Sequence, residues 1–265
     1  MTWILPETER LLSPNRNTGR RAMRPDTLVL HYAVDHDNRP DGDSFIDDDS
    51  ALGENFTPRE RSHDCMDVAR LFARESRRAS AHLVIGRDGS KVQCVELADT
   101  AWHAGGGAFP DDGAGPVEPP QSGLMNRRSY GIEICNAGFA VDKLKVPAAD
   151  RISAAHPARP RKVMEWETFP AVQIRTLEYA VSLIATAAFG GLKYVTGHED
   201  VVNSHTRGQF KRGELVKPRY GGKVDPGPAF PWDAIDWASM GIRRIRYDFK
   251  QRAWVDHYAE LERAA

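Results

Sequence analysis

Two histidines, an aspartate and a lysine are placed where they could assemble a catalytic metal site. Lys223 and Asp225 lie two positions apart and directly before Pro226-Gly227. In an extended segment residues i and i+2 point the same way, so both side chains could face one site. His198 lies in a predicted loop, and His31 ends an apolar run. Such a set would make a catalytic zinc site, in which three protein ligands leave one position open for water.

The spacing of these residues does not by itself select them as ligands, because they lie far apart along the chain. A single histidine on an apolar run is more often a structural residue with satisfied hydrogen bonds than a ligand. An aspartate before a proline more often belongs to a turn. At the level of the residues alone, the structural and the catalytic interpretations both stay open.

Composition places the chain among ordinary globular proteins. Its 265 residues can form one large domain with a substantial core. A hydrophobic content of 41% and a charged content of 28% are typical of that class. The formal net charge of −1 gives no electrostatic signature for nucleic acid, so we expect no nucleic-acid partner. No apolar run is long enough for a transmembrane helix, and we expect a monomer that does not insert into membranes.

The cysteines and the N-terminus indicate a reducing compartment. The three cysteines are too few and too widely spaced for a disulfide framework. No CxxC pair occurs, so we expect buried, inert thiols and no thiolate zinc site. The first ten residues lack a basic start followed by a long apolar stretch, so they do not resemble a signal peptide. We therefore expect synthesis in the cytoplasm.

The predicted elements alternate between strands and helices. Apolar, β-rich runs predict strands and one hairpin, at 27–32, 81–85 with 91–96, 129–135 and 192–196. Periodic apolar positions predict helices over 62–78 and 168–189. Residues 140–163 look irregular. Strands and helices mixed around one sheet indicate an α/β or α+β fold with helices packed on the sheet.

We expect one main domain with two extensions. Residues 1–25 form a polar and basic N-terminal arm, and residues 233–265 form a helical extension packed on the same domain. The main domain spans 26–232. Loop insertions are expected within it at 36–60, 104–128 and 201–222. The acidic run in the first insertion lacks the regular spacing of a calcium loop, which indicates a solvated surface.

Six short stretches of the chain indicate a protein family when they are taken together and in order. They are LVLHYAVD (28–35), SAHLVIGRDGSKVQ (80–93), AWHAGG (101–106), SYGIEICN (129–136), VTGHEDV (195–201) and KVDPGPAFPW (223–232). In these stretches the chain resembles the zinc-dependent N-acetylmuramoyl-L-alanine amidases of the type 2 amidase and peptidoglycan-recognition-protein superfamily. The resemblance implies a central mixed β-sheet of about five or six strands flanked by helices.

The resemblance also implies a role for each candidate residue. His31, His198 and Asp225 fall where the three zinc ligands of the family lie, so one catalytic Zn²⁺ is expected. Glu133 matches the general acid/base carboxylate. Lys223 matches the cation that stabilises the tetrahedral oxyanion.

Four further residues are expected near the substrate. His82 and His103 match positions near the substrate cleft of the family, where they would bind substrate or support a ligand. Trp102 could form an apolar wall for sugar or peptide, or belong to the core. Asn136 could bind the stem peptide or cap the end of a strand. The other histidines are expected on the surface, namely His36, His63, His156, His205 and His257.

The implied activity is hydrolysis of the amide bond between N-acetylmuramic acid and L-alanine, with peptidoglycan or a muropeptide as the partner. Two alternatives remain: a peptidoglycan-binding module without turnover, and a zinc peptidase acting on the stem peptide. The module is disfavoured because all three ligand positions are retained. The enzyme could act on the cell wall after release, as a phage endolysin does, or on wall fragments in the cytosol. The basic segment 207–219 could form a rim for anionic peptides or a solvated loop.

Overall fold

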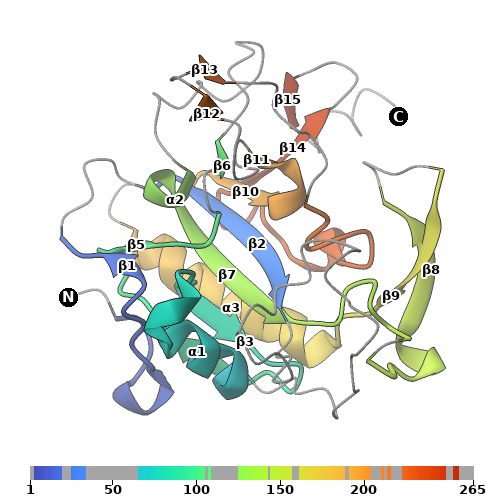
Figure 1. The fold of residues 1–265 in the computed structure, drawn as a ribbon, viewed down its shortest axis with the longest axis horizontal. Coiled ribbons are helices and arrows are strands. Elements are labelled where there is room, and N and C mark those ends of the chain that lie inside the picture. Colours follow the sequence, from blue (N-terminus) through green and yellow to red (C-terminus); the bar gives the residue numbers. More distant parts are fainter. Residues whose placement is uncertain are drawn as a thin grey trace.

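One seven-stranded sheet forms the centre of the protein (Figure 1), in the strand order β15-β14-β10-β2-β7-β3-β4. These strands are β2 (Thr27–Ala33), β3 (Leu83–Ile85), β4 (Lys91–Gln93), β7 (Ser129–Cys135), β10 (Tyr194–Gly197), β14 (Arg243–Asp248) and β15 (Ala253–Asp256). The structure is a computed structural model, and it describes residues 3–19, 25–33, 65–104, 107–108, 125–142, 144–156, 161–188, 191–203, 210–211, 214–215, 223–248 and 253–256.

The sheet is mixed, as expected, and has seven strands rather than five or six. Strands β14, β10, β2, β7 and β3 run parallel to one another. The two edge strands β15 and β4 run antiparallel to their neighbours. Every residue of β2 and β7 is buried, including the polar residues His31 and Glu133, because both faces of these central strands are covered.

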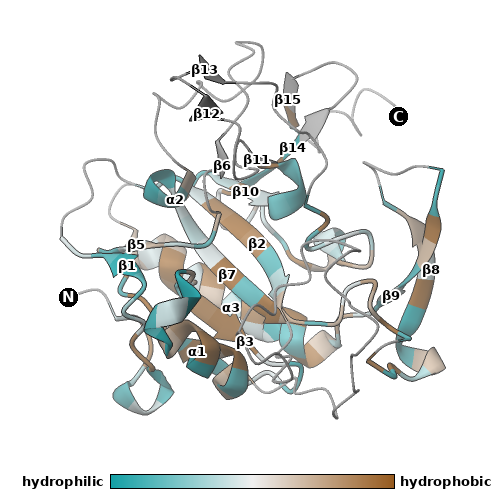
Figure 2. Cartoon of the chain, viewed as in Figure 1, coloured by the Kyte–Doolittle hydropathy of each residue, from teal (hydrophilic) through white to brown (hydrophobic). Residues whose placement is uncertain are grey.

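Helices cover both faces of the sheet. Helix α3 (Ala171–Ala187) packs Leu177 and Ile184 against Leu30 and Ile132 on one face. Helix α1 (Cys65–Ala73) packs Phe72 against the opposite face. Figure 2 shows apolar residues along α3 and the neighbouring strands. Because both faces are covered, polar side chains that project from the central strands enter a dry environment.

The helices are somewhat shorter than expected. Helix α3 begins after Pro170, and no side chain caps it. The predicted cap Thr168 instead donates its hydroxyl to the backbone oxygen of Asp150, at 3.2 Å. Of the helix expected over 62–78, the described part is α1, and Glu75–Arg77 form a separate 3₁₀ turn, η3.

The smaller elements lie around the sheet. They are β1 (Arg16–Asn17), β5 (Thr100–Ala101), β6 (Gly107–Ala108), α2 (Met125–Arg128), β8 (Arg151–Ala155), β9 (Val163–Glu167), β11 (Val202–Asn203), β12 (Phe210–Lys211) and β13 (Glu214–Leu215), with 3₁₀ turns η1 (Glu7–Glu9), η4 (Ala148–Asp150), η5 (His198–Asp200) and η6 (Trp232–Ala234). Strands β6, β11, β12 and β13 fall within the loops expected at 104–128 and 201–222. The insertion at 36–60 lies outside the described residues.

The described part of the N-terminal arm, residues 3–19, packs closely on the domain. The backbone N–H of Leu11 donates to the oxygen of Gln93 on the edge strand β4, at 3.0 Å. Ser13 and Asn15 donate side-chain hydrogen bonds to the oxygen of Phe72 in the last turn of α1, at 2.6 and 3.1 Å. The arm therefore covers a sheet edge and satisfies a helix terminus, both of which would otherwise expose backbone polar groups.

Two predictions about secondary structure are wrong. The C-terminal segment was expected to be helical, but its described residues form the η6 turn and then β14 and β15. Residues 140–163 were expected to be irregular, but β8 and β9 form an antiparallel hairpin. The spacing of Ile242 and Ile245 suits a helix, yet Arg243 and Arg244 pair with β10 as part of β14, and both isoleucines are buried.

All three cysteines are free and buried, as the sequence indicated. Burial raises the pKa of the Cys94 thiol, with smaller contributions from Cys65 and Glu133. Cys94 therefore stays protonated and inert. Within the described ranges, no helix combines the length and the apolar character needed to cross a membrane.

We expect Leu177→Ala to lower the free energy of unfolding by about 2–5 kcal/mol, because it leaves a cavity between α3 and the sheet. The matched control is Tyr179→Ala on the same helix, where the side chain is 55% exposed and the expected change is within about 0.5 kcal/mol. Urea unfolding measures both values. Equal effects of the two substitutions would contradict the packing described for α3.

Candidate metal centre

Three side chains converge at the carboxyl ends of the parallel strands. The Nδ1 atoms of His31 and His198 lie 3.0 Å apart, and Asp225 Oδ2 lies 3.1 Å from the first and 3.0 Å from the second. All three residues are buried. Three atoms with lone pairs thus point at one another in a nearly equilateral triangle.

This triangle fits a metal ion. Ligands bound to tetrahedral zinc at about 2.0–2.2 Å lie about 3.3 Å from one another, slightly more than the observed separations. Two imidazole nitrogens and one carboxylate oxygen form a donor set that zinc uses. Within the described parts of the chain, His31, His198 and Asp225 are the one cluster of this kind.

The topology of the sheet explains how His31 and His198 meet. His31 lies near the end of β2, and His198 directly follows β10. The two strands are parallel neighbours in which Gly197 is paired with Leu30, so the next residues, His198 and His31, lie side by side. Parallel strands end at the same edge of a sheet, which is where α/β proteins place their sites.

Two glycines allow Asp225 to approach this edge. A Cβ on Gly197 would lie 2.7 Å from Cδ of Pro226, so a larger residue there would push the Asp225 turn away. Gly227 has a φ of +78°, and its Cβ would lie 2.6 Å from Cζ3 of Trp166. The backbone N–H of Glu199 then donates to the oxygen of Asp225 at 2.8 Å and joins the two loops.

Burial sets the protonation that a metal ligand needs. Burial is the largest of the effects that together lower the pKa of His31 to about 4, and the charge of His198 is the next, so His31 is neutral at pH 7. Burial alone would raise the pKa of Asp225. The attraction of His198 and the hydrogen bonds from both histidines outweigh it and hold that pKa well below its usual value. The centre therefore offers an imidazole lone pair and a carboxylate at neutral pH.

A chain of hydrogen bonds lies behind His31. Its Nε2 is 3.0 Å from Nδ1 of His103, and Nε2 of His103 is 3.1 Å from Oγ of Ser129. Ser129 in turn donates its hydroxyl to the oxygen of Met125, at 2.6 Å. If Nδ1 of His31 is the ligand atom, Nε2–H donates to His103, and every donor in the chain has one acceptor. Gly131 provides room, because its Cβ would lie 2.4 Å from the His103 ring.

Glu133 and Lys223 lie beside the cluster. Glu133 on β7 is paired in register with His31 on β2, so the two side chains share one face of the sheet, and Glu133 is 3% exposed. Lys223 is half-buried, and its charge contributes to the low pKa of His31. Val224 packs with Trp166 on the other side of the segment. This alternation supports the expectation that Lys223 and Asp225 face one site.

The other candidate residues differ in how deeply they are buried. His82 and Asn136 are fully buried, which favours the alternatives of a supporting residue and a strand-end cap, and substrate contact by either stays a prediction. His82 Nδ1 accepts from the N–H of Gly131 at 3.0 Å. Asn136 Oδ1 accepts from the N–H of Gly138 at 2.8 Å, which matches the alternative of a strand-end cap. His103 lies 3.0 Å from the ligand candidate His31, which favours a supporting role, and substrate contact by His103 or by the half-buried Trp102 stays a prediction.

Sequence reasoning missed one buried histidine. His156 was expected on the surface, but it is 1% exposed, and its Nε2 lies 2.6 Å from a carboxylate oxygen of Glu199. It also stacks on Trp166 with a ring-centroid distance of 5.9 Å. No local sequence pattern predicts the burial of His156, because its hydrogen-bond partner Glu199 is distant in sequence. The four remaining histidines fall outside the described residues, namely His36, His63, His205 and His257.

Comparisons with known proteins identify the family of the chain. Residues 21–228 match the family model described as N-acetylmuramoyl-L-alanine amidase. No curated protein matches the chain. Similar solved structures include a selenomethionine derivative of AmpD, with 20% identity over 89% of this chain and 95% of that one and a TM-score of 0.43.

Two further solved structures are similar at the same level. AmiD from E. coli, in complex with the substrate anhydro-N-acetylmuramic acid-L-Ala-D-gamma-Glu-L-Lys, has 20% identity, covers 85% of this chain and 61% of its own, and gives a TM-score of 0.43. AmpDH3 from Pseudomonas aeruginosa has 21% identity, with coverages of 94% and 71% and a TM-score of 0.44. The family match at residues 21–228 spans most of the 265 residues and includes the whole cluster, so the chain belongs to the N-acetylmuramoyl-L-alanine amidase family, the hydrolases that cleave the amide bond between N-acetylmuramic acid and L-alanine in peptidoglycan.

Proposed function

We propose that the enzyme is a zinc amidase that holds one Zn²⁺ through Nδ1 of His31, Nδ1 of His198 and Oδ2 of Asp225. The observation that carries this proposal is the triangle of these three atoms, with sides of 3.0–3.1 Å. The alternative of a binding module without turnover has no support from the site, because a complete donor set converges there.

The remaining chemistry can be assigned to residues of the chain. A zinc ion bound by these ligands would polarise the amide carbonyl and bring the pKa of its water close to neutrality. Glu133 would accept the proton of the attacking water and return it to the leaving amine of L-alanine. Its buried position beside His31 favours this role, since a base shielded from bulk water keeps the proton near the reacting atoms.

Lys223 would act on charge that develops during the reaction. The carbonyl oxygen becomes negative as the tetrahedral state forms, and the ammonium group of Lys223 would stabilise that charge. The interaction is stronger in the transition state than with bound substrate, so it raises kcat more than it lowers KM. The position of Lys223 two residues before Asp225 supports this assignment.

The proposal is tested by product analysis with and without metal. Purified protein is depleted of metal with a chelator, restored with zinc, and incubated with soluble muropeptides and with intact sacculi. We expect mass spectrometry to find two products only after zinc is restored. One is the sugar with a free lactyl carboxyl group, and the other is the peptide with a free N-terminal L-alanine. Cleavage between amino acids of the stem would indicate the peptidase, and binding without product would indicate the module. Faster turnover of sacculi would support action on the wall, and faster turnover of fragments would support recycling.

We expect Glu133→Gln to lower kcat by about 10²–10⁴-fold while the protein still binds one zinc, because the amide cannot accept the proton. Steady-state kinetics on a muropeptide and metal analysis of the purified variant give the two values. Glu75→Gln, at an exposed position away from the site, serves as the control. A near-normal rate for Glu133→Gln would show that another group is the base.

We expect Lys223→Ala to lower kcat by about 10²–10³-fold with little change in KM, because the lost interaction belongs to the transition state. Lys193→Ala removes an exposed lysine and should leave both constants unchanged. A raised KM with normal kcat would instead indicate that Lys223 binds the substrate before reaction.

A further inference from the structure

The β8–β9 hairpin lies outside the central sheet (Figure 1), yet it reaches both loops that carry ligands of the metal centre. These loops are η5 (His198–Asp200) and the segment 223–227 that contains Asp225. Among the residues that the structure describes, no strand pairing joins the hairpin to the seven strands. Its contacts with the two loops are made by side chains.

The first contact holds the His198 loop. Nε2 of His156, just beyond β8, lies 2.6 Å from the carboxylate of Glu199. A carboxylate can only accept, so Nε2 carries the hydrogen and donates it. The two side chains are 1% and 13% exposed, which makes this a shielded, charge-assisted hydrogen bond. The N–H of Glu199 also binds the oxygen of Asp225, so His156 acts on both loops.

The second contact supports the Asp225 turn. Trp166 on β9 is fully buried, and its Nε1–H donates to the oxygen of Ala154 across the hairpin at 3.1 Å. Its ring packs against Val224, just before Asp225, and leaves no space for a side chain at Gly227. The ring of His156 stacks on the same tryptophan, so the two contacts form one unit.

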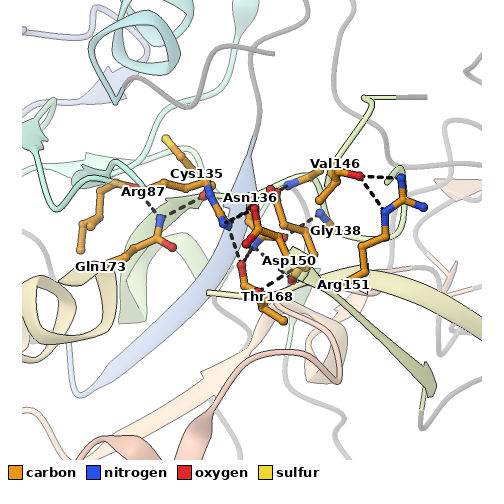
Figure 3. Close-up of polar contacts among 12 residues, drawn as sticks. Arg87, Cys135, Asn136, Gly138, Val146, Asp150, Arg151, Thr168 and Gln173 are labelled. Atoms are coloured by element: carbon orange, nitrogen blue, oxygen red, sulfur yellow. Dashed lines mark hydrogen bonds and ion pairs between the residues drawn. The ribbon is translucent and has the colours of Figure 1, made fainter. Parts of the chain in front are cut away.

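The base of the hairpin is anchored to the end of β7 (Figure 3). Nδ2 of Asn136 donates to the oxygens of Glu167 and Thr168, at 3.3 and 3.2 Å. The N–H of Glu167 donates to the oxygen of Gly138 at 2.9 Å. Arg87 forms an ion pair at 3.4 Å with the fully buried Glu167 carboxylate. The hairpin therefore extends from the strand that carries Glu133 to the loops that carry His198 and Asp225.

We propose that the β8–β9 hairpin braces the metal centre, with His156 and Trp166 as positioning residues that set the separation of His198 and Asp225. The inference rests on the zinc site proposed above. Both ligands lie on loops, and a loop that must be ordered during binding reduces the affinity for the metal. A brace that orders both loops in advance removes this cost.

The test measures zinc affinity in the full-length chain. Metal-free protein is titrated against a chromophoric chelator for the wild type, Glu199→Ala, His156→Phe and the double variant. Loss of outer partners of metal ligands weakens binding by about 10–100-fold, and we expect this loss for each single variant. The double variant should bind no more weakly than the weaker single variant, because both changes break one contact.

Two further variants distinguish positioning from other effects. Glu199→Gln retains an oxygen that accepts from His156, so we expect it to keep most of the affinity. Val163→Ala alters a 68% exposed side chain on the same hairpin and should bind zinc as the wild type does. Urea unfolding of the metal-free proteins is measured in parallel, because a purely structural contact would lower stability without changing the zinc affinity of the folded chain.

Wild-type zinc affinity in both Glu199→Ala and His156→Phe would overturn the brace and leave the zinc amidase intact. A wild-type protein that binds no zinc at this site would overturn the proposed function and the brace together. Weaker binding in both single variants, with affinity retained in Glu199→Gln, supports the brace.

Discussion

The convergence of three donor atoms in a dry site is the constraint on which the rest of the structure depends. His31, His198 and Asp225 place polar atoms 3.0–3.1 Å apart in a site that is largely shielded from bulk water. Burying such groups is unfavourable unless they are paired or bind a metal. The surrounding protein must therefore hold three distant segments of the chain in one arrangement that they would not adopt separately.

The parallel sheet meets most of this requirement. Two neighbouring strands that end at the same edge deliver His31 and His198 side by side, and the next strand adds Glu133 in register with His31. The burial of His31 at this edge is the largest cause of its low pKa, and the charge of His198 adds to it. The third ligand comes from a loop. It needs Gly197 for a close backbone approach and Gly227 for a positive φ.

Residues around the ligands divide into two supporting groups. On one side, His103 and Ser129 continue the hydrogen bonding of His31 into the protein interior. On the other side, the hairpin contacts the two ligand loops through His156 and Trp166. Asn136 anchors the base of that hairpin. A polar residue in a motif near an active site can thus act by holding the surrounding backbone in place.

The sequence by itself determined the features that depend on local pattern. The buried strands are recognisable because β2 is largely an apolar, β-rich run and β7 has apolar residues at alternate positions. The residues alone left the roles of His31, His198 and Asp225 open, and only the resemblance of six ordered stretches to the amidase family implied that they are ligands. Tertiary structure alone decided the C-terminal strands, the β8–β9 hairpin and the burial of His156. Each of these features is stabilised by a partner far away in the chain. The partner is β10 for the C-terminal strands, the end of β7 for the hairpin, and the carboxylate of Glu199 for His156. No local sequence pattern encodes such a partner.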